Sequence, residues 1–300
     1  MAITAPTTLS DFSGFIPAEI AAPIFEDAAE QSAVQRLGQR LELGLSGQAI
    51  PVVTSRPTAS WVSEAGQKAA SSGKMSLKTM SPKKLATIVV VSEEVVRANP
   101  ANYVELIRSQ MAEAFATAFD SAALHGTNTP FDNYIDETAN SVAFGTNAAD
   151  DGGIYADVLA GMGLVLDGGN KVRGFLFDET SEVDLLGAVD TTGRPLWVGT
   201  PLEDTASAVI PGRLLGRTSL LASGVKSDDI IGYCGDWNQV AWGVVGGINY
   251  RVSTEASVTI DGSLVSLFEY NLVAILAEAE YGLVINNVDA FCQYTDGESS

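Results

Sequence analysis

The sequence predicts an α+β fold that combines a projecting β-hairpin, one long helix and a region of short alternating elements. Residues 74–91 alternate apolar and polar side chains before becoming continuously apolar, which is typical of a long strand. Residues 99–126 have the apolar spacing of a long helix, and residues 127–262 alternate short helical and extended stretches. With 300 residues and 46% hydrophobic content, the chain can bury one large core or two moderate cores.

Charge is unevenly distributed along the chain. The 37 Asp and Glu against 17 Lys and Arg give a formal net charge of -20. Residues 51–110 differ, because they hold eight basic and four acidic side chains. Binding to a nucleic acid backbone depends on basic side chains, so the overall charge argues against a protein that grips DNA. The sequence therefore predicts one cationic segment on an anionic chain.

Residues 1–48 are predicted to form an N-terminal arm. A short amphipathic helix is expected where Ile24, Phe25, Ala28 and Ala29 share one side, and so small a segment cannot close a core by itself. The arm should therefore lie on another surface. The N-terminus has no Lys or Arg and no long apolar run, and no later stretch is apolar enough to cross a membrane, so a cytosolic origin is expected.

Residues 49–91 are predicted to form a hairpin whose tip is rich in Gly, Ser and Ala. Beyond Pro82 the side chains are apolar at both odd and even positions, which point to opposite faces of a strand. This pattern is typical of a strand covered on both faces. From Lys74 to Val91 the strand would span about 60 Å at about 3.3 Å per residue. A compact chain of this length has a radius of gyration of only about 19 Å. The outer part of the hairpin should therefore project.

Residues 92–127 are predicted to contain the longest helix of the chain. Asn99 is expected as its N-cap, Pro100 as its first helical residue and Gly126 as its stop signal. One apolar stripe runs along the helix and predicts its buried face, formed by Tyr103, Ile107, Met111, Phe115 and Phe119.

Residues 128–262 are predicted to form a mixed α/β domain, and residues 263–300 are predicted to return as long strands beside the long helix. The expected elements of the domain are helices near 154–166 and 179–189 and strands near 172–177, 214–221 and 230–237. The glycine-rich stretch 243–248 predicts a tight bend between strands.

The sequence offers little of the chemistry that enzymes use. His125 is the single histidine, and its place at the end of the long helix favours a structural role. No catalytic-triad or zinc pattern accompanies it, and Gly212–Ser219 lacks the spacing of a phosphate-binding loop. Cys234 and Cys292 belong to no CxxC pair and are expected as free buried thiols. Neither a cofactor nor a metal is predicted, and an α/β hydrolase or ligand-binding enzyme is the rival class.

The order of these parts resembles the major capsid proteins of tailed bacteriophages, whose fold is shared with encapsulin shells. The resemblance covers nearly the whole chain and is most specific at residues 59–126, 178–197, 235–244 and 267–285. It implies that 49–91 is an E-loop reaching over a neighbouring subunit. It further implies a peripheral domain formed by 92–127, with its spine helix, and the return strands 263–300, and an axial domain formed by 128–262 around five- and six-fold axes.

The resemblance implies a structural protein that is not an enzyme. Copies would assemble into hexamers and pentamers of an icosahedral shell enclosing double-stranded DNA without sequence-specific binding. The shell would be the virion capsid, assembled in the bacterial host cytoplasm without a membrane. Because no long helical segment precedes the arm, either a separate scaffolding protein or a sequence that is already mature is expected. A portal and decoration proteins are further expected partners. An encapsulin-type compartment is the alternative within the same fold.

Inter-subunit contacts through the hairpin are expected at Trp61, Lys68, Lys74 and Lys78. A cationic projection on an anionic chain lets identical subunits bind head to tail in closed rings. The alternative is that these lysines only solvate an exposed strand and block edge pairing.

The resemblance also implies a conditional isopeptide cross-link. Lys68 of one subunit would react with Asn271 of another, and Glu278 would accept a proton. This chemistry requires an apolar pocket that keeps the lysine amine neutral, with proximity supplying the rate.

Overall fold

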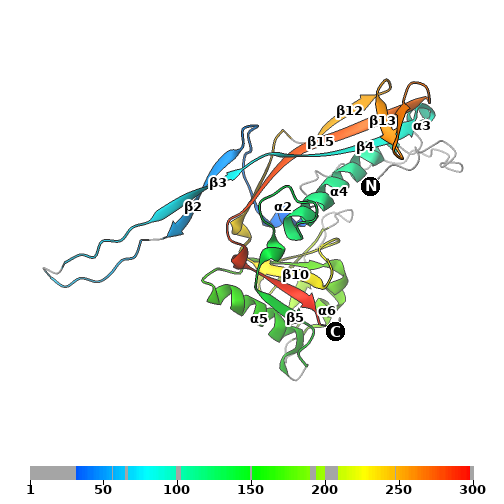
Figure 1. Ribbon diagram of the computed structural model, residues 1–300. Helices are drawn as coiled ribbons and strands as arrows, with labels where there is room; N and C mark the ends of the chain where they lie inside the picture. The colour runs from blue at the N-terminus through cyan, green and yellow to red at the C-terminus, as the bar shows by residue number, and fades with distance from the viewer. Residues whose placement is uncertain are drawn as a thin grey trace.

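The computed structural model describes residues 32–55, 57–64, 67–98, 103–148, 151–189, 194–199, 209–246 and 248–297. Within them the chain forms an elongated part, a compact part and a hairpin that projects from their junction (Figure 1). We refer to the two parts by the names expected for them, peripheral domain and axial domain. The predicted arm helix around Ile24 and the predicted caps Asn99 and Pro100 lie outside the described residues.

The hairpin consists of β2 (Gln48–Ser55) and β3 (Lys74–Met80), which pair antiparallel, with an extended tip between them. The predicted projection is confirmed, and Figure 1 shows the tip far from the rest of the molecule. The predicted single strand is interrupted at Ser81 and Pro82, after which β4 (Lys83–Ser92) begins. Proline lacks the N–H that a continuous ladder needs, which explains the break.

The peripheral sheet is built around β15 (Leu272–Ile285), the longest strand. Its order is β1-β11-β15-β12, and β4 also pairs antiparallel with β15. The other strands of this sheet are β1 (Gln39–Arg40), β11 (Val240–Val244) and β12 (Asn249–Ser253). A separate hairpin of β13 (Ser257–Ile260) and β14 (Ser263–Ser266) lies at the far end of the sheet.

The spine helix α4 (Tyr103–Leu124) runs along this sheet, with α3 (Glu93–Ala98) before it and α2 (Ala33–Leu37) packed against it. All five predicted stripe residues of α4 are at least nine-tenths buried. The predicted stop also holds, because Gly126 adopts a positive φ of 68° two residues after the helix ends.

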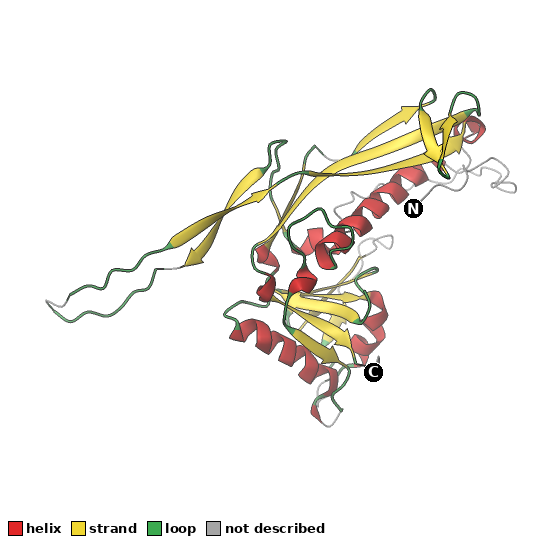
Figure 2. Cartoon of the chain, in the orientation of Figure 1, coloured by secondary structure: helices red, strands yellow, loops and turns green. Residues whose placement is uncertain are grey.

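The axial domain contains a seven-stranded mixed sheet of order β5-β16-β10-β6-β9-β8-β7. Its strands are β5 (Ser141–Phe144), β6 (Gly174–Asp178), β7 (Trp197–Gly199), β8 (Val209–Leu214), β9 (Arg217–Ala222), β10 (Ile230–Gly235) and β16 (Phe291–Asp296). Helices α5 (Gly153–Asp167) and α6 (Glu182–Gly187) flank this sheet (Figure 2), and four 3-10 turns complete the described elements: η3 (Ile135–Glu137), η5 (Glu179–Ser181), η6 (Trp237–Gln239) and η7 (Val288–Ala290).

Two hydrophobic clusters lie on the two faces of the axial sheet. Phe175 and Phe177 face α5 and α6 and share a cluster with Val158 and Leu185. Leu176 and Tyr233 point to the opposite face and join the cluster that contains the buried side of α4. The alternation along β6 therefore connects the axial domain to the spine helix through one continuous core.

Sheet pairing corrects the predicted boundaries of the two domains. Strands β11 and β12, expected within the axial segment 128–262, pair into the sheet of β15, and the β13–β14 hairpin packs against β4 and β15. Strand β16, expected as a peripheral return strand, lies inside the axial sheet. The cause is long-range pairing: β16 pairs with β10 and β5, whose positions no local periodicity encodes.

The expectation that β4 is covered on both faces is wrong for most of its length. Only Val90, Val91 and Ser92 are buried, and Ile88 is 39% exposed. The strand pairs with β15 and lies over α4 on one face. Its other face is covered only near Val90, where the β13–β14 hairpin packs.

The two cysteines are free and buried, as predicted. They are far apart in sequence but directly opposite each other across the antiparallel strands β10 and β16. The Tyr294 hydroxyl donates to the Cys234 sulfur at 3.2 Å. Burial raises the pKa of the Cys234 thiol well above its ordinary value, so the thiol stays protonated.

Candidate assembly surfaces

The base of the hairpin is fixed to the body of its own chain. The Lys78 ammonium group donates to the carbonyl oxygens of Ile285 at 2.8 Å and of Asn286 at 3.0 Å, where β15 ends. The Asn133 side chain donates to the same Ile285 carbonyl at 3.2 Å. Lys78 is thus used within the subunit, and its predicted contact with a second subunit stays a prediction.

Two residues beyond Lys78, the fully buried Met80 fills a notch in the peripheral sheet. Gly243 and Gly282 face each other across β11 and β15 and form the floor of this notch. A Cβ atom at Gly282 would lie 2.7 Å from Met80 Cγ, so only glycine admits this side chain. The hairpin therefore leaves the body from a packed and hydrogen-bonded base.

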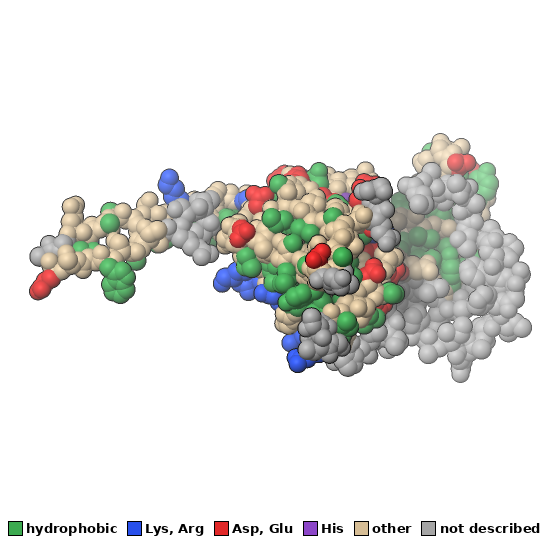
Figure 3. Space-filling view, turned by 90° about the horizontal axis from the view of Figure 1, so that it is seen from below, with side chains coloured by type: hydrophobic (Ala, Val, Ile, Leu, Met, Phe, Trp, Pro, Cys, Tyr) green, Lys and Arg blue, Asp and Glu red, His purple; other side chains and the backbone are tan. Residues whose placement is uncertain are grey.

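The outer hairpin, by contrast, exposes apolar side chains. Trp61 is fully exposed, and Met75 and Leu77 are 67% and 69% exposed. Lys68 and Lys74 are exposed beside them. Figure 3 shows hydrophobic side chains along the projecting hairpin with nothing from the body covering them. An exposed apolar projection of this kind marks an interaction site.

The three residues predicted for the cross-link lie apart within one chain. Lys68 is on the hairpin tip, and Asn271 lies at the opposite end of the molecule, immediately before β15. Glu278 lies seven residues further along β15, or about 23 Å at about 3.3 Å per residue. These residues could meet only between subunits.

The surroundings of Glu278 differ from the pocket that the cross-link needs. Its carboxylate lies 3.1 Å from Lys84 Nζ and 3.7 Å from Arg251 Nη2. Asn271 donates its amide to Glu94 at 3.1 Å, and the pKa of Glu94 is lowered by its own backbone hydrogen bond and by this amide. The surroundings of Glu278 are polar, and its carboxylate is paired with two cationic side chains, whereas a lysine amine stays neutral only in an apolar pocket.

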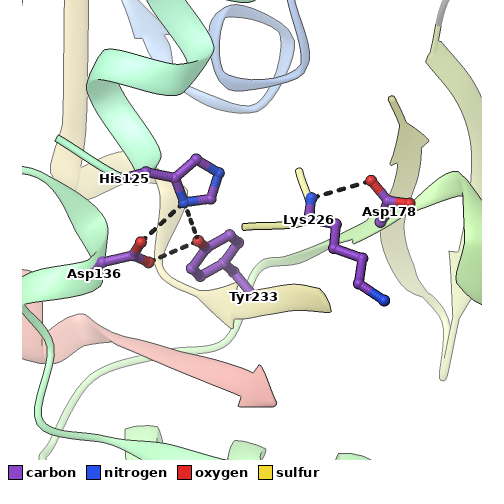
Figure 4. A network of polar contacts seen from close by, with 5 residues as sticks. All are labelled: His125, Asp136, Asp178, Lys226 and Tyr233. Carbon is purple, nitrogen blue, oxygen red and sulfur yellow. Dashed lines mark hydrogen bonds and ion pairs between the residues drawn. The ribbon is translucent and has the colours of Figure 1, made fainter. Parts of the chain in front are cut away.

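A buried polar cluster joins the spine helix to the axial sheet (Figure 4). His125, directly after α4, places Nδ1 2.9 Å from Asp136 and 3.1 Å from the Tyr233 hydroxyl of β10. The Tyr233 hydroxyl donates to Asp136 at 2.6 Å. Burial and the neighbouring Asp136 charge raise the pKa of Tyr233, which stays a neutral donor. Pattern reading found only His125 of this cluster, and the predicted structural role fits its buried position.

A second polar contact holds the first described residues against the spine helix. The Asp120 carboxylate accepts hydrogen bonds from the Ser32 hydroxyl, the Ala33 N–H at 2.8 Å and the Val34 N–H at 3.3 Å. The residue is partly exposed by surface area, but its carboxylate is surrounded by protein atoms. The loss of solvating water dominates, and burial raises the pKa of Asp120 to about 7.

No metal-binding group of three or more His, Cys, Asp or Glu occurs among the described residues. The same part of the chain contains no helix that is long and apolar enough to span a membrane. The His125 cluster lies beneath the protein surface, which leaves the rival enzyme class without a histidine open to a substrate.

Residues 13–296 match the model of the family described as "Phage capsid family". The chain belongs to the phage capsid family. The "Probable major capsid protein gp17" of Mycobacterium phage L5 is 37% identical over 99% of this chain and 94% of that protein. Its counterpart from Mycobacterium phage D29 is 38% identical over 95% and 91%. A solved chain from Mycobacterium phage Adephagia superposes with a TM-score of 0.72 at 16% identity, covering 99% of this chain and 100% of that one, which shows the shared fold.

Family membership confirms the predicted capsid fold and the predicted structural coat role. It also accounts for a hairpin with exposed apolar side chains, since copies of a coat protein cover one another. The sequence did not reveal the Lys78 anchor, the Met80 notch or the Asp120 contact, because each depends on pairing with strands or helices far along the chain.

Proposed function

We propose that this protein is the major capsid subunit of a tailed phage and assembles into the hexamers and pentamers of an icosahedral shell around double-stranded DNA. Each hairpin reaches over a neighbouring subunit, and the axial domains surround the five- and six-fold axes. The role needs no cofactor. It places the protein in the virion capsid after assembly in the host cytoplasm.

The exposed hairpin is the observation that carries this proposal. Trp61, Met75 and Leu77 lie on a projection that its own chain leaves uncovered, while Lys78 and Met80 fix its base. A monomeric protein rarely keeps large apolar side chains on such a projection, so a second copy is their natural cover. The cationic side chains beside them favour a neighbour with the negative charge of this chain.

The net charge of -20 supports a wall that encloses DNA without binding it tightly. The proposal includes a separate scaffolding protein, a portal and decoration proteins as partners. The named relatives are phage proteins, which favours a virion over an encapsulin-type compartment.

Electron microscopy and sedimentation velocity of the purified protein test the proposal. We expect closed shells or capsomer rings from the native chain. Replacing Trp61 and Leu77 together by Ser should reduce assembly at least tenfold and leave the unfolding midpoint unchanged, because both side chains are exposed in the single subunit. A native chain that stays monomeric at every concentration, also when coexpressed with its scaffolding protein, would contradict the proposal.

We expect the assembled protein, after boiling in detergent, to run as a single 31.4 kDa band on a denaturing gel. Glu278 is already paired with Lys84 and Arg251, so it offers no apolar pocket to a neutral Lys68 amine. The opposite result would be a ladder of heavier bands that disappears in Lys68→Arg, which keeps the charge but not the primary amine. That ladder would establish a cross-link through the Lys68 amine, and an isopeptide bond of this amine to Asn271 would release ammonia as the leaving group.

A further inference from the structure

The two buried cysteines occupy matching positions on neighbouring strands of the axial sheet. Cys234 on β10 and Cys292 on β16 are partners in the antiparallel register, and both side chains belong to the same hydrophobic cluster. Directly opposite residues of antiparallel strands have their Cα atoms about 4.5–5.5 Å apart. A disulfide spans Cα separations of about 4.4–6.8 Å, so this pair meets the distance requirement without a movement of the backbone.

The two sulfur atoms also interact with each other. The pKa of the Cys234 thiol is raised mainly by burial and next by a hydrogen bond with Cys292, so the two sulfur atoms lie within hydrogen-bond reach. The Tyr294 hydroxyl and the Arg217 guanidinium lower this pKa in part. Cys234 is therefore the sulfur whose neighbours stabilise the thiolate, which is the form that reacts with oxidants.

Helix α5 covers the cysteine pair. The Tyr294 hydroxyl lies 3.1 Å from the Val158 carbonyl oxygen of α5 and 3.2 Å from the Cys234 sulfur. A Cβ atom at Gly161 would lie 2.5 Å from the Tyr294 oxygen, so glycine at this position of α5 makes room for the tyrosine. Both cysteines are fully buried as a result. Only an oxidant close to water in size should reach them in the folded chain, and its reaction should be slow.

We propose that Cys234 and Cys292 form an internal cross-strand disulfide when the folded protein meets a hydroperoxide. The Cys234 thiolate attacks one oxygen of hydrogen peroxide, the O–O bond breaks, and the products are a sulfenic acid and, once the thiol proton is taken up, water. Cys292 then attacks the sulfenic sulfur, the S–S bond forms, and the S–O bond breaks as the oxygen leaves with the second thiol proton as water. In the net reaction two thiols lose two electrons and two protons, and hydrogen peroxide accepts them to become two molecules of water.

The position of the pair gives this disulfide a stabilising role. Strand β10 leads through η6 into β11 of the peripheral sheet, and β15 returns through η7 into β16. The bond would join the two strands beside these connections and close a loop of residues 235–291, which contains β11, β12 and β15. A cross-link across so long a loop stabilises the folded chain because it restricts the unfolded one.

The compartment decides when the bond forms. Cytosolic reductants keep thiols reduced, whereas oxidants prevail outside the cell. A coat protein would therefore assemble with two thiols and acquire the disulfide after the particle leaves its host. This timing rests on the proposed function, whereas the chemistry of the pair does not.

Intact mass spectrometry of the full chain tests the bond. The folded protein is treated with hydrogen peroxide and then unfolded in urea with N-ethylmaleimide, which alkylates free thiols. The untreated chain should take up two labels, one on each of its two cysteines. The treated chain should take up none, weigh about 2 Da less before labelling, and run as a monomer on a non-reducing gel. A phosphine reductant should restore both labels, and the oxidised chain should unfold about 5–10 °C above the reduced one.

Cys292→Ser is the matched control, because it keeps the Cys234 thiol and removes only the partner sulfur. Its unfolding midpoint should not rise with peroxide. A second reference, which needs no variant, is the native chain treated with peroxide in urea, where both thiols are exposed. Peroxide that consumes the thiols in urea but leaves both free in the folded chain overturns the proposal, and so does a gain of oxygen atoms without a bond that the phosphine breaks. A ladder of linked chains overturns it as well. None of these results changes the proposed coat role, which the assembly experiment decides.

Discussion

Replacing Phe119 by Ala should lower the free energy of unfolding by about 3–5 kcal/mol, the cost of removing a fully buried aromatic side chain. The Phe119 ring is 2% exposed and lies 5.3 Å from the ring of Tyr281, 6.0 Å from Phe131 and 6.4 Å from Trp242, measured between centroids. These partners come from β15, the segment after α4 and β11. The cavity would therefore open where the spine helix meets the peripheral sheet.

Chemical denaturation of the unassembled chain, followed by tryptophan fluorescence, measures this loss. Thr117→Ala is the matched control, because Thr117 is exposed on the opposite side of the same helix and Ala has the higher helix propensity. The control should stay within about 0.5 kcal/mol of the native chain. A Phe119→Ala variant as stable as the control would show that this junction does not hold the subunit together.

The elements with a clear local period could be predicted from the sequence. The apolar stripe of α4 predicted its buried face, and Gly126 predicted its end. The alternating residues before Met80, with their lysines, predicted a projecting strand. In each case, the spacing of apolar residues within one helix or strand indicates which of its side chains are buried, and this spacing can be read from nearby residues alone.

The assembly surfaces could be predicted only in part. The hairpin was found because its lysines contrast with an anionic chain. The anchor of Lys78 was not predictable, because its ammonium group donates to backbone carbonyl oxygens. Every residue has such a carbonyl, so no residue type in the sequence marks the contact. Long-range pairing also placed β16 in the axial sheet.

Unfolding of the native chain should become easier as the pH rises from about 4 to about 7, and Asp120 should be a main cause. Burial raises the pKa of its carboxyl from 3.8 to about 7 in the folded chain. Below pH 4 the group is protonated in both states and costs nothing. Between these values the unfolded chain releases the proton while the folded chain retains it, so stability falls as pH rises. Above pH 7 the full loss is present, at most about 4 kcal/mol since the residue is partly exposed.

The variant Asp120→Asn isolates this contribution. An amide cannot ionise, so its free energy of unfolding should vary less with pH between 4 and 7 than that of the native chain. Its absolute stability should be lower, because the amide nitrogen would face a backbone donor of Ala33 or Val34 in place of an accepting oxygen. Asp132→Asn, which removes an exposed carboxylate after the same helix, controls for the change in net charge. If the free energy of unfolding changes equally with pH in Asp120→Asn and in the native chain, Asp120 is not the cause of the change. Hydrogen exchange at residues 33–37 would then show whether α2 still loosens as the pH rises.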